Sequence, residues 1–210
     1  MPRPKKTEQQ LQSTRELILD TAYTILQEDG PQAITSRAIA ERMGIAHMSL
    51  YTYFENQPAI LRALGDRELA KMRTRLHVFE QRAKTEAVQT VVADLLQFLI
   101  TFARENPNQF HLAWVMPEIG SELVEQTRQR MYNTVEQLAH LIQTGIEKGE
   151  FAEREPFLAA ATVLGMVNTP YILFHSGKLA NPVLRDHMTE EVIFAAMLYL
   201  KSPNKDRPEK

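Results

Sequence analysis

Residues 34–57 read ITSRAIAERMGIAHMSLYTYFENQ, and this stretch decides the fold of the chain. Thr35 is a good helix N-cap because its hydroxyl can accept a hydrogen bond from a free backbone N–H of the first turn. Apolar residues follow at helical spacing, and Gly44 supplies the left-handed residue that ends a helix. Leu50 and Phe54 then lie four residues apart, on one face of a second short segment. The pattern predicts a helix-turn-helix.

The two short helices carry side chains suited to DNA. Ser36 and Arg37 begin the first of them, where backbone N–H groups and a guanidinium can meet a phosphate or a guanine edge. The second helix is expected to expose a polar and polarizable face to solvent, made of His47, Met48, Ser49, Thr52 and Tyr53. Each has a plainer interpretation, such as a solvated His47 or an ion pair between Arg37 and Glu41.

The order GIAHMSLYTYF, preceded by TSRAIA, resembles the DNA-binding domain of the TetR (tetracycline repressor) family. Residues 15–30, RELILDTAYTILQEDG, look like the first helix of that family. The resemblance covers roughly the first third of the chain, and the remainder matches only in length and helical character. It implies a ligand-responsive transcriptional regulator, most simply a repressor, which binds an inverted-repeat operator as a homodimer and is released by a small-molecule effector.

The basic N-terminal residues, the helix positions and the resemblance together indicate which residues contact DNA. They are Lys5, Lys6, Thr35, Ser36, Arg37, Ala46, His47, Met48, Ser49, Tyr51, Tyr53 and Gln57. Three of them depart from the family pattern. Ala46 stands where a capping Ser is common, Met48 replaces a common Gly, and Gln57 replaces a common phosphate-contacting Lys. These departures predict a modest affinity for DNA that depends strongly on salt.

Charge alone does not indicate a nucleic-acid partner. The chain has 24 Lys and Arg against 26 Asp and Glu, a net charge of −2. Residues 1–57 hold six basic side chains against seven acidic ones, and three of the six lie in the first six residues. Residues 1–12 are expected to form a flexible basic arm, which either contacts DNA or is a solvated tail.

Composition places the chain among proteins that fold without cross-links. There is no Cys, which excludes disulfides and thiolate metal sites and fits a reducing cytoplasm. The N-terminal residues are basic and polar without an apolar segment behind them, so no signal peptide is expected. Polar residues and Pro170 interrupt the longest apolar stretch, residues 157–174, which favours a buried helix over a membrane span.

Periodicity along the rest of the chain predicts an all-α protein of about nine helices. Ser13 is expected to cap the first helix, and a long fourth helix from Pro58 joins residues 1–57, the DNA-binding domain, to residues 58–210, a ligand-binding and dimerisation domain. The last helix is expected to begin at Thr189. Expected helices are 13–30, 35–43, 45–54, 58–84, 86–105, 109–115, 121–148, 157–175 and 189–200. The last two are apolar all round, which predicts a homodimer formed through them.

The C-terminal half offers side chains that line apolar pockets and also line ordinary cores. The candidates for an effector site are Met72, Phe98, Phe102, His111, Trp114, Met131, Met166, Asn168, Tyr171 and His175. No acidic cluster indicates a cationic ligand, so an apolar or aromatic effector is expected.

An enzyme finds little support in the sequence. The six His residues form no H-E-x-x-H pattern, and neither a G-x-S-x-G motif nor a Gly-rich phosphate loop is present. No cofactor, catalytic residue or metal site is therefore expected. The remaining alternative is a helical adaptor or scaffold protein that does not bind DNA.

Overall fold

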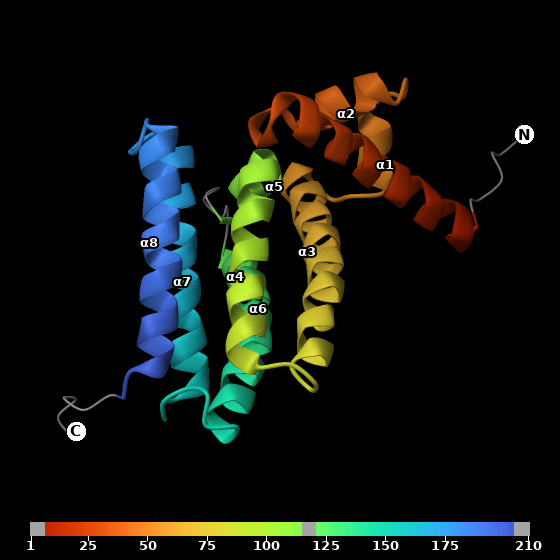
Figure 1. Ribbon diagram of the computed structural model, residues 1–210. Coiled ribbons are helices and arrows are strands. Elements are labelled where there is room, and N and C mark those ends of the chain that lie inside the picture. Colours follow the sequence, from red (N-terminus) through yellow and green to blue (C-terminus); the bar gives the residue numbers. More distant parts are fainter. Residues whose placement is uncertain (1–6, 115–120, 204–210) are drawn as a thin grey trace, which may run out of the picture.

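The computed structural model describes residues 7–114 and 121–203, without the side chains of residues 113, 114, 121–131 and 133. The described residues are all-helical and contain no strand, which confirms the expected fold class (Figure 1). The α-helices are α1 (Glu8–Asp29), α2 (Ser36–Arg42), α3 (Gln57–Arg82), α4 (Val88–Glu105), α5 (Pro107–Trp114), α6 (Ser121–Glu147), α7 (Pro156–His175) and α8 (Pro182–Lys201), and the 3-10 helices are η1 (Pro31–Ala33) and η2 (His47–Thr52).

The molecule has two separate hydrophobic cores. The smaller one joins α1, α2 and η2 to the first turns of α3, and it includes the fully buried Ile18, Ile39 and Leu50. The larger one holds α4 and α6–α8 together, with α6 packed on α7 and α7 packed on α8 over the most extensive contacts. Helix α3 belongs to both cores, because Leu64 is buried in the first and Leu76 in the second.

Helix α1 begins earlier than expected. Thr7 caps it in a capping box with Gln10, in which the Gln10 backbone N–H donates to Thr7 Oγ1 over 3.3 Å. The prediction of a flexible arm is therefore wrong for residues 8–12, which form the first turn of α1. Ser13 is not the cap, because its hydroxyl donates to the Gln9 carbonyl within the helix. Thr7 and Gln10 lie in polar sequence without an apolar stripe. Periodicity therefore could not predict this first turn.

The expected recognition helix is a 3-10 helix, η2. The Ser49 N–H donates to the Ala46 carbonyl over 2.8 Å, and Ala46 offers no side-chain cap. At a helix start without a capping side chain, i→i+3 hydrogen bonds can satisfy backbone N–H groups that would otherwise have no partner. Gly44 precedes it with φ +63°, the left-handed conformation expected at the end of α2.

Helix α8 also begins earlier than expected, at Pro182 instead of Thr189. Asn181 caps it by accepting from the Val183 and Leu184 backbone N–H groups, and Pro182 occupies the first turn. The pair Asn181-Pro182 indicated a loop, although Pro at the first position of a helix is equally typical. Residues 182–188 therefore add about two turns to α8.

Helix α7 is long and apolar enough to cross a membrane, by length and composition. Its packing gives another explanation, because Val163, Val167 and Tyr171 are buried in the larger core and Asn168 is buried with them. One face of α7 is therefore buried within the chain, and its expected place in a dimer interface stays a prediction.

Close packing makes Gly145 a sensitive position for stability. A Cβ at Gly145 of α6 would overlap the buried ring of Phe151. We expect Gly145→Ala to lower the free energy of unfolding by about 1–3 kcal/mol, measured by urea denaturation at fixed protein concentration. In a Phe151→Val background the same change should cost much less, and an equal cost in both backgrounds would contradict this packing.

Candidate functional site

The exposed face of η2 is the first part of the site. His47, Ser49 and Thr52 are exposed, and Met48 is exposed with 72% of its surface accessible. Leu50 points the other way and is 1% exposed, so it fixes the segment to the smaller core. The helix-turn-helix therefore presents a compact set of hydrogen-bonding and apolar groups on an anchored backbone.

His47 and Tyr51 form a pair on this face. Their rings meet edge to face with centroids 5.3 Å apart, and the Tyr51 hydroxyl lies 3.5 Å from His47 Nε2. Tyr51 is 41% exposed. The pair holds a hydroxyl and an imidazole side by side, both able to donate to or accept from a nucleic acid.

Helix α2 presents a second contact surface. Thr35 is its N-cap, as expected, and accepts from the Ala38 backbone N–H over 3.1 Å. Ser36 is buried, so its side chain offers little to an external partner. Arg37 is exposed, and among the described residues it makes no ion pair, with Glu41 or otherwise. Arg42, in contrast, is held by Glu28 and Asp29.

Two of the expected contact residues turn inward. Tyr53 is 7% exposed and packs in the smaller core, so the expectation that it faces solvent is wrong. Gln57 donates from Nε2 to the Ile34 carbonyl over 2.8 Å, which ties the start of α3 to the loop before α2. Ala46 is exposed at the start of η2. Lys5 and Lys6 lie outside the described residues.

Sequence analysis did not anticipate Arg15, which supports η2 from α1. Its Nη1 donates to the Tyr53 carbonyl, and its guanidinium lies 4.1 Å from the centroid of the Phe54 ring. The end of η2 therefore depends on a cation–π contact and a charge-assisted bond from another helix. The long separation of these residues in sequence leaves no local pattern to reveal the contact.

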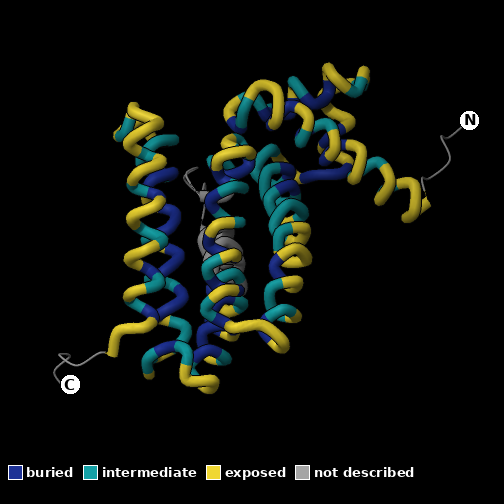
Figure 2. Tube along the Cα trace, in the orientation of Figure 1, coloured by how far each residue is buried: buried dark blue, intermediate teal, exposed yellow. Residues whose placement is uncertain are grey.

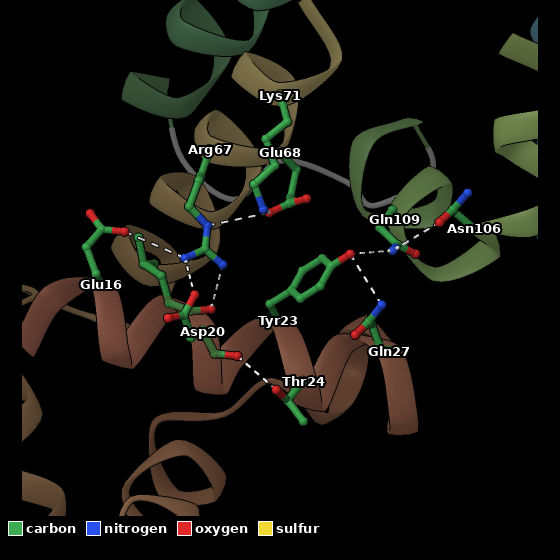
Figure 3. A network of polar contacts seen from close by, with 11 residues as sticks. Glu16, Asp20, Tyr23, Thr24, Gln27, Arg67, Glu68, Lys71, Asn106 and Gln109 are labelled. Atoms are coloured by element: carbon green, nitrogen blue, oxygen red, sulfur yellow. Dashed lines mark hydrogen bonds and ion pairs between the residues drawn. The ribbon is translucent and has the colours of Figure 1, made fainter. Parts of the chain in front are cut away.

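Helix α5 joins the two cores. Gln109 Nε2 donates to the Tyr23 hydroxyl of α1 over 3.1 Å, and the Gln27 side chain donates to the same hydroxyl over 3.3 Å (Figure 3). Asn108 donates to the Gln27 carbonyl over 3.3 Å. Gln109 is 9% exposed, so its bond to Tyr23 is largely shielded from water.

A second connection runs from α1 to α3 through Arg67. Its Nη1 donates to Asp20 over 2.7 Å and lies 3.6 Å from Glu16, while Nη2 donates to the Leu19 carbonyl over 3.2 Å (Figure 3). The side chain of Arg67 is only 18% exposed. One guanidinium therefore fixes the angle between α1 and α3 with several directed bonds.

The expected effector residues whose side chains the structure describes are spread over α3, α4, α5 and α7. Phe98 packs against Phe79 with ring centroids 5.7 Å apart, and Met72 and Met166 border the larger core. Phe102 is half-buried in α4 and Asn168 is buried in α7. The side chains of Trp114 and Met131 lie outside the described residues. A cavity of about 10 Å³, room for one water molecule, lies among α3, α4, α6 and α7. Its lining is Leu76, Glu80, Leu95, Leu99, Thr134, Gln137, Leu138, Leu141 and Leu164.

Three expected effector residues do come together. His111 of α5 lies 6.3 Å from His175 of α7, and Tyr171 lies 6.4 Å from His175, between ring centroids. Burial lowers the pKa of His175, and the nearby His111 and Arg185 lower it further. Burial raises the pKa of the Tyr171 hydroxyl. No group of three or more metal-ligating side chains is found in the described part of the chain.

Comparison with known proteins decides the family. Residues 18–64 match the model of bacterial regulatory proteins of the tetR family, and residues 85–193, more than half of the chain, match the tetracyclin repressor-like C-terminal domain. This chain belongs to the TetR family. The matched N-terminal segment contains α2, η2 and the face described above.

The relatives of this chain include transcriptional regulators. Tetracycline repressor protein class D of Escherichia coli is 31% identical over 134 residues, which is 62% of this chain and 55% of that protein. The match to the first relatives therefore spans only about half of their length. FadR of Bacillus subtilis, solved with stearoyl-CoA, superposes with a TM-score of 0.66 at 18% identity over 85% of this chain and 97% of FadR. Thermus thermophilus FadR, a TetR-family repressor solved with lauroyl-CoA, gives 0.68 at 13% identity over 93% of this chain and all of that chain. These two likenesses show the fold.

The exposed Arg37 and His47 are expected to contribute to DNA binding. We expect Arg37→Ala and His47→Ala each to weaken binding by about tenfold, because each removes a contact of the kind that is worth about 1–3 kcal/mol. Fluorescence anisotropy on a duplex selected from random sequence measures the affinity. Arg75→Ala, an exposed Arg in the C-terminal half of α3, is the matched control and should change affinity less than about twofold. Equal losses in all three variants would indicate non-specific charge attraction alone.

Proposed function

We propose that the protein is a ligand-responsive transcriptional repressor that binds an inverted-repeat operator as a homodimer. The observation that carries this proposal is the exposed set on η2, held in place by the buried Leu50. Such a segment can enter a major groove with its side chains toward base edges. The relatives are regulators rather than enzymes, and a reducing cytoplasm suits a Cys-free DNA-binding protein.

An apolar surface on α7 and α8 supports a homodimer. Phe194 is 68% exposed, and at the left edge of Figure 2 exposed residues recur along α8. On α7, Gly165 is exposed, and a Cβ there would meet no atom of the chain. The small residue leaves room for a second copy to approach the backbone closely. Other exposed apolar side chains of this surface are Leu158, Val183, Leu184 and Leu198.

We expect Phe194→Glu to convert the dimer to a monomer, since it places a charge at the centre of an apolar interface. Sedimentation velocity measures the mass in solution. Operator affinity should fall at least about tenfold, because a monomer reads only one half-site. Val78→Glu, a change at another exposed apolar side chain on α3, should leave the mass unchanged. If the Phe194→Glu variant remained a dimer, as the Val78→Glu variant is expected to, the proposed interface would be contradicted.

The effector is proposed to bind in the C-terminal bundle. The two FadR structures hold long-chain acyl-CoA, so an acyl compound is the first class to test on this chain. An effector that binds the bundle better in one conformation would tilt α3 and move α5 against α1, which changes the separation of the two η2 segments. The bonds of Gln109 and Asn108 to α1 provide the contact through which α5 acts.

Tyr23→Phe tests this contact because it removes only the hydroxyl that Gln109 and Gln27 bind. We expect operator affinity to stay within about twofold, while the ratio of operator affinities without and with saturating effector shrinks by about threefold or more. Tyr132→Phe, at an exposed Tyr on α6 that packs on Phe157, is the matched control. An unchanged ratio in Tyr23→Phe would exclude the hydroxyl from the coupling.

Selection from a pool of random duplexes, followed by sequencing at several salt concentrations, tests the repressor proposal itself. One enriched inverted repeat, bound more weakly as salt rises, is the expected result. No enrichment at low salt, with and without cell extract as a source of effector, would overturn the proposal and favour a helical adaptor.

A further inference from the structure

Five aromatic and imidazole side chains meet where α5 packs on α7. The Phe110 ring centroid lies 5.5 Å from that of His175 and 5.8 Å from that of Tyr171. Phe174 meets His175 edge to face at 5.7 Å, and His111 lies 6.3 Å from His175. His175 is therefore at the centre of this group, which we call the His175 cluster.

Arg185, on the first turns of α8, completes the His175 cluster. Its guanidinium carbon lies 4.6 Å from the Phe174 centroid and 5.2 Å from the Tyr171 centroid, and its side chain is only 13% exposed. Its acidic partner is Asp186, one residue on, whose Oδ1 accepts from Nε over 2.8 Å and also lies 2.7 Å from Nη2. The guanidinium has five N–H donors, so some of its donors remain for another acceptor.

The polar groups of the cluster lack a matching acceptor. The atom His175 Nε2 is buried and has no hydrogen-bond partner among the residues that the structure describes. The charged and titratable groups that act on His175 are His111 from α5 and Arg185 from α8, both cationic when charged. Asp186, half exposed, is already paired with Arg185. A half-buried imidazole whose Nε2 is shielded from water, beside a guanidinium, is an arrangement that an anion would complete.

We propose that the His175 cluster binds the anionic headgroup of an apolar effector. A carboxylate or phosphate oxygen accepts from His175 Nε2–H and from the Arg185 guanidinium, and the half-buried ring of Phe174 contacts the adjoining apolar chain. This assignment rests on the proposed function, because it identifies the chemical class of the effector. Ligand binding at this cluster can alter the DNA-binding domain through α5. Phe110 and His111 of the cluster lie on the same helix as Gln109, which donates to Tyr23 of α1.

The proposal also predicts proton uptake. Burial and positive neighbours hold the pKa of His175 below its ordinary value, so the imidazole is mostly neutral near pH 7. An anion at Nε2 stabilises the imidazolium and raises that pKa, so binding takes up a proton and tightens as pH falls from 8 to 6.

Isothermal titration calorimetry with three probes of equal chain length tests the assignment on the full chain. Laurate carries a carboxylate, lauroyl-CoA carries phosphates, and dodecanol is neutral. Tight binding of laurate alone assigns the carboxylate, tight binding of lauroyl-CoA alone assigns the phosphates, and either result supports the proposal. Dodecanol bound as tightly as the anions, or no binding of any probe, would overturn it.

Variants of the cluster locate the headgroup. Arg185→Gln and His175→Phe should each weaken anion binding by about tenfold, Arg185→Lys should restore part of the loss, and His175→Phe should abolish proton uptake, measured in two buffers of different ionisation enthalpy. Arg154→Gln is the matched control, because Arg154 also stacks on an aromatic ring, Tyr199, at 4.1 Å. Unchanged affinity in both cluster variants, with native circular dichroism, would overturn the site.

Operator selection separates the two proposals. If the chain enriches an inverted repeat but anions bind equally well to wild type and to the cluster variants, the repressor proposal stands and the headgroup site does not. If the cluster variants lose anion binding but no operator is found, the site stands as a ligand site and the repressor proposal fails.

Discussion

The relation between the two halves of the molecule depends on where helix α5 lies. Phe110 is 2% exposed in the larger core, while its neighbour Gln109 donates to Tyr23 of α1. One turn of helix is therefore fixed from both sides, by apolar burial toward α7 and by a shielded hydrogen bond toward α1. Any change in the bundle that moves Phe110 also moves the partner of Tyr23. Helix α1 is held a second time by Arg67 of α3, which donates to Asp20 and to the Leu19 carbonyl.

Local patterns were sufficient to predict the architecture. The helix-turn-helix follows from Thr35, Gly44 and the spacing of Leu50 and Phe54, and the long α3 follows from Pro58 and the apolar positions after it. These features act within a few residues of chain, where periodicity and capping decide structure. The exposure of His47 and Met48 could be predicted for the same reason, since Leu50 fixes the inner side of η2.

Contacts between distant residues account for what the sequence did not reveal. Tyr53 lies in the core and Arg15 of α1 binds its carbonyl, and Gln57 reaches the Ile34 carbonyl, 23 residues away. Each contact pairs segments that no short window contains. The His175 cluster was anticipated only in part, because His111, Tyr171 and His175 were expected effector residues but Arg185 was placed in a loop. The earlier start of α8 at Pro182 brings Arg185 onto the rings of α7.

In the proposed mechanism, a ligand in the bundle changes the distance between two DNA-reading segments. The chain has no Cys, so Glu41→Cys, at an exposed position on α2, gives one spin label per subunit. Double electron–electron resonance then reports one inter-subunit distance distribution in the proposed homodimer. We predict a narrow distribution on operator DNA and a shifted one when effector is added. Identical distance distributions with and without bound effector would contradict the proposed change in the separation of the two segments.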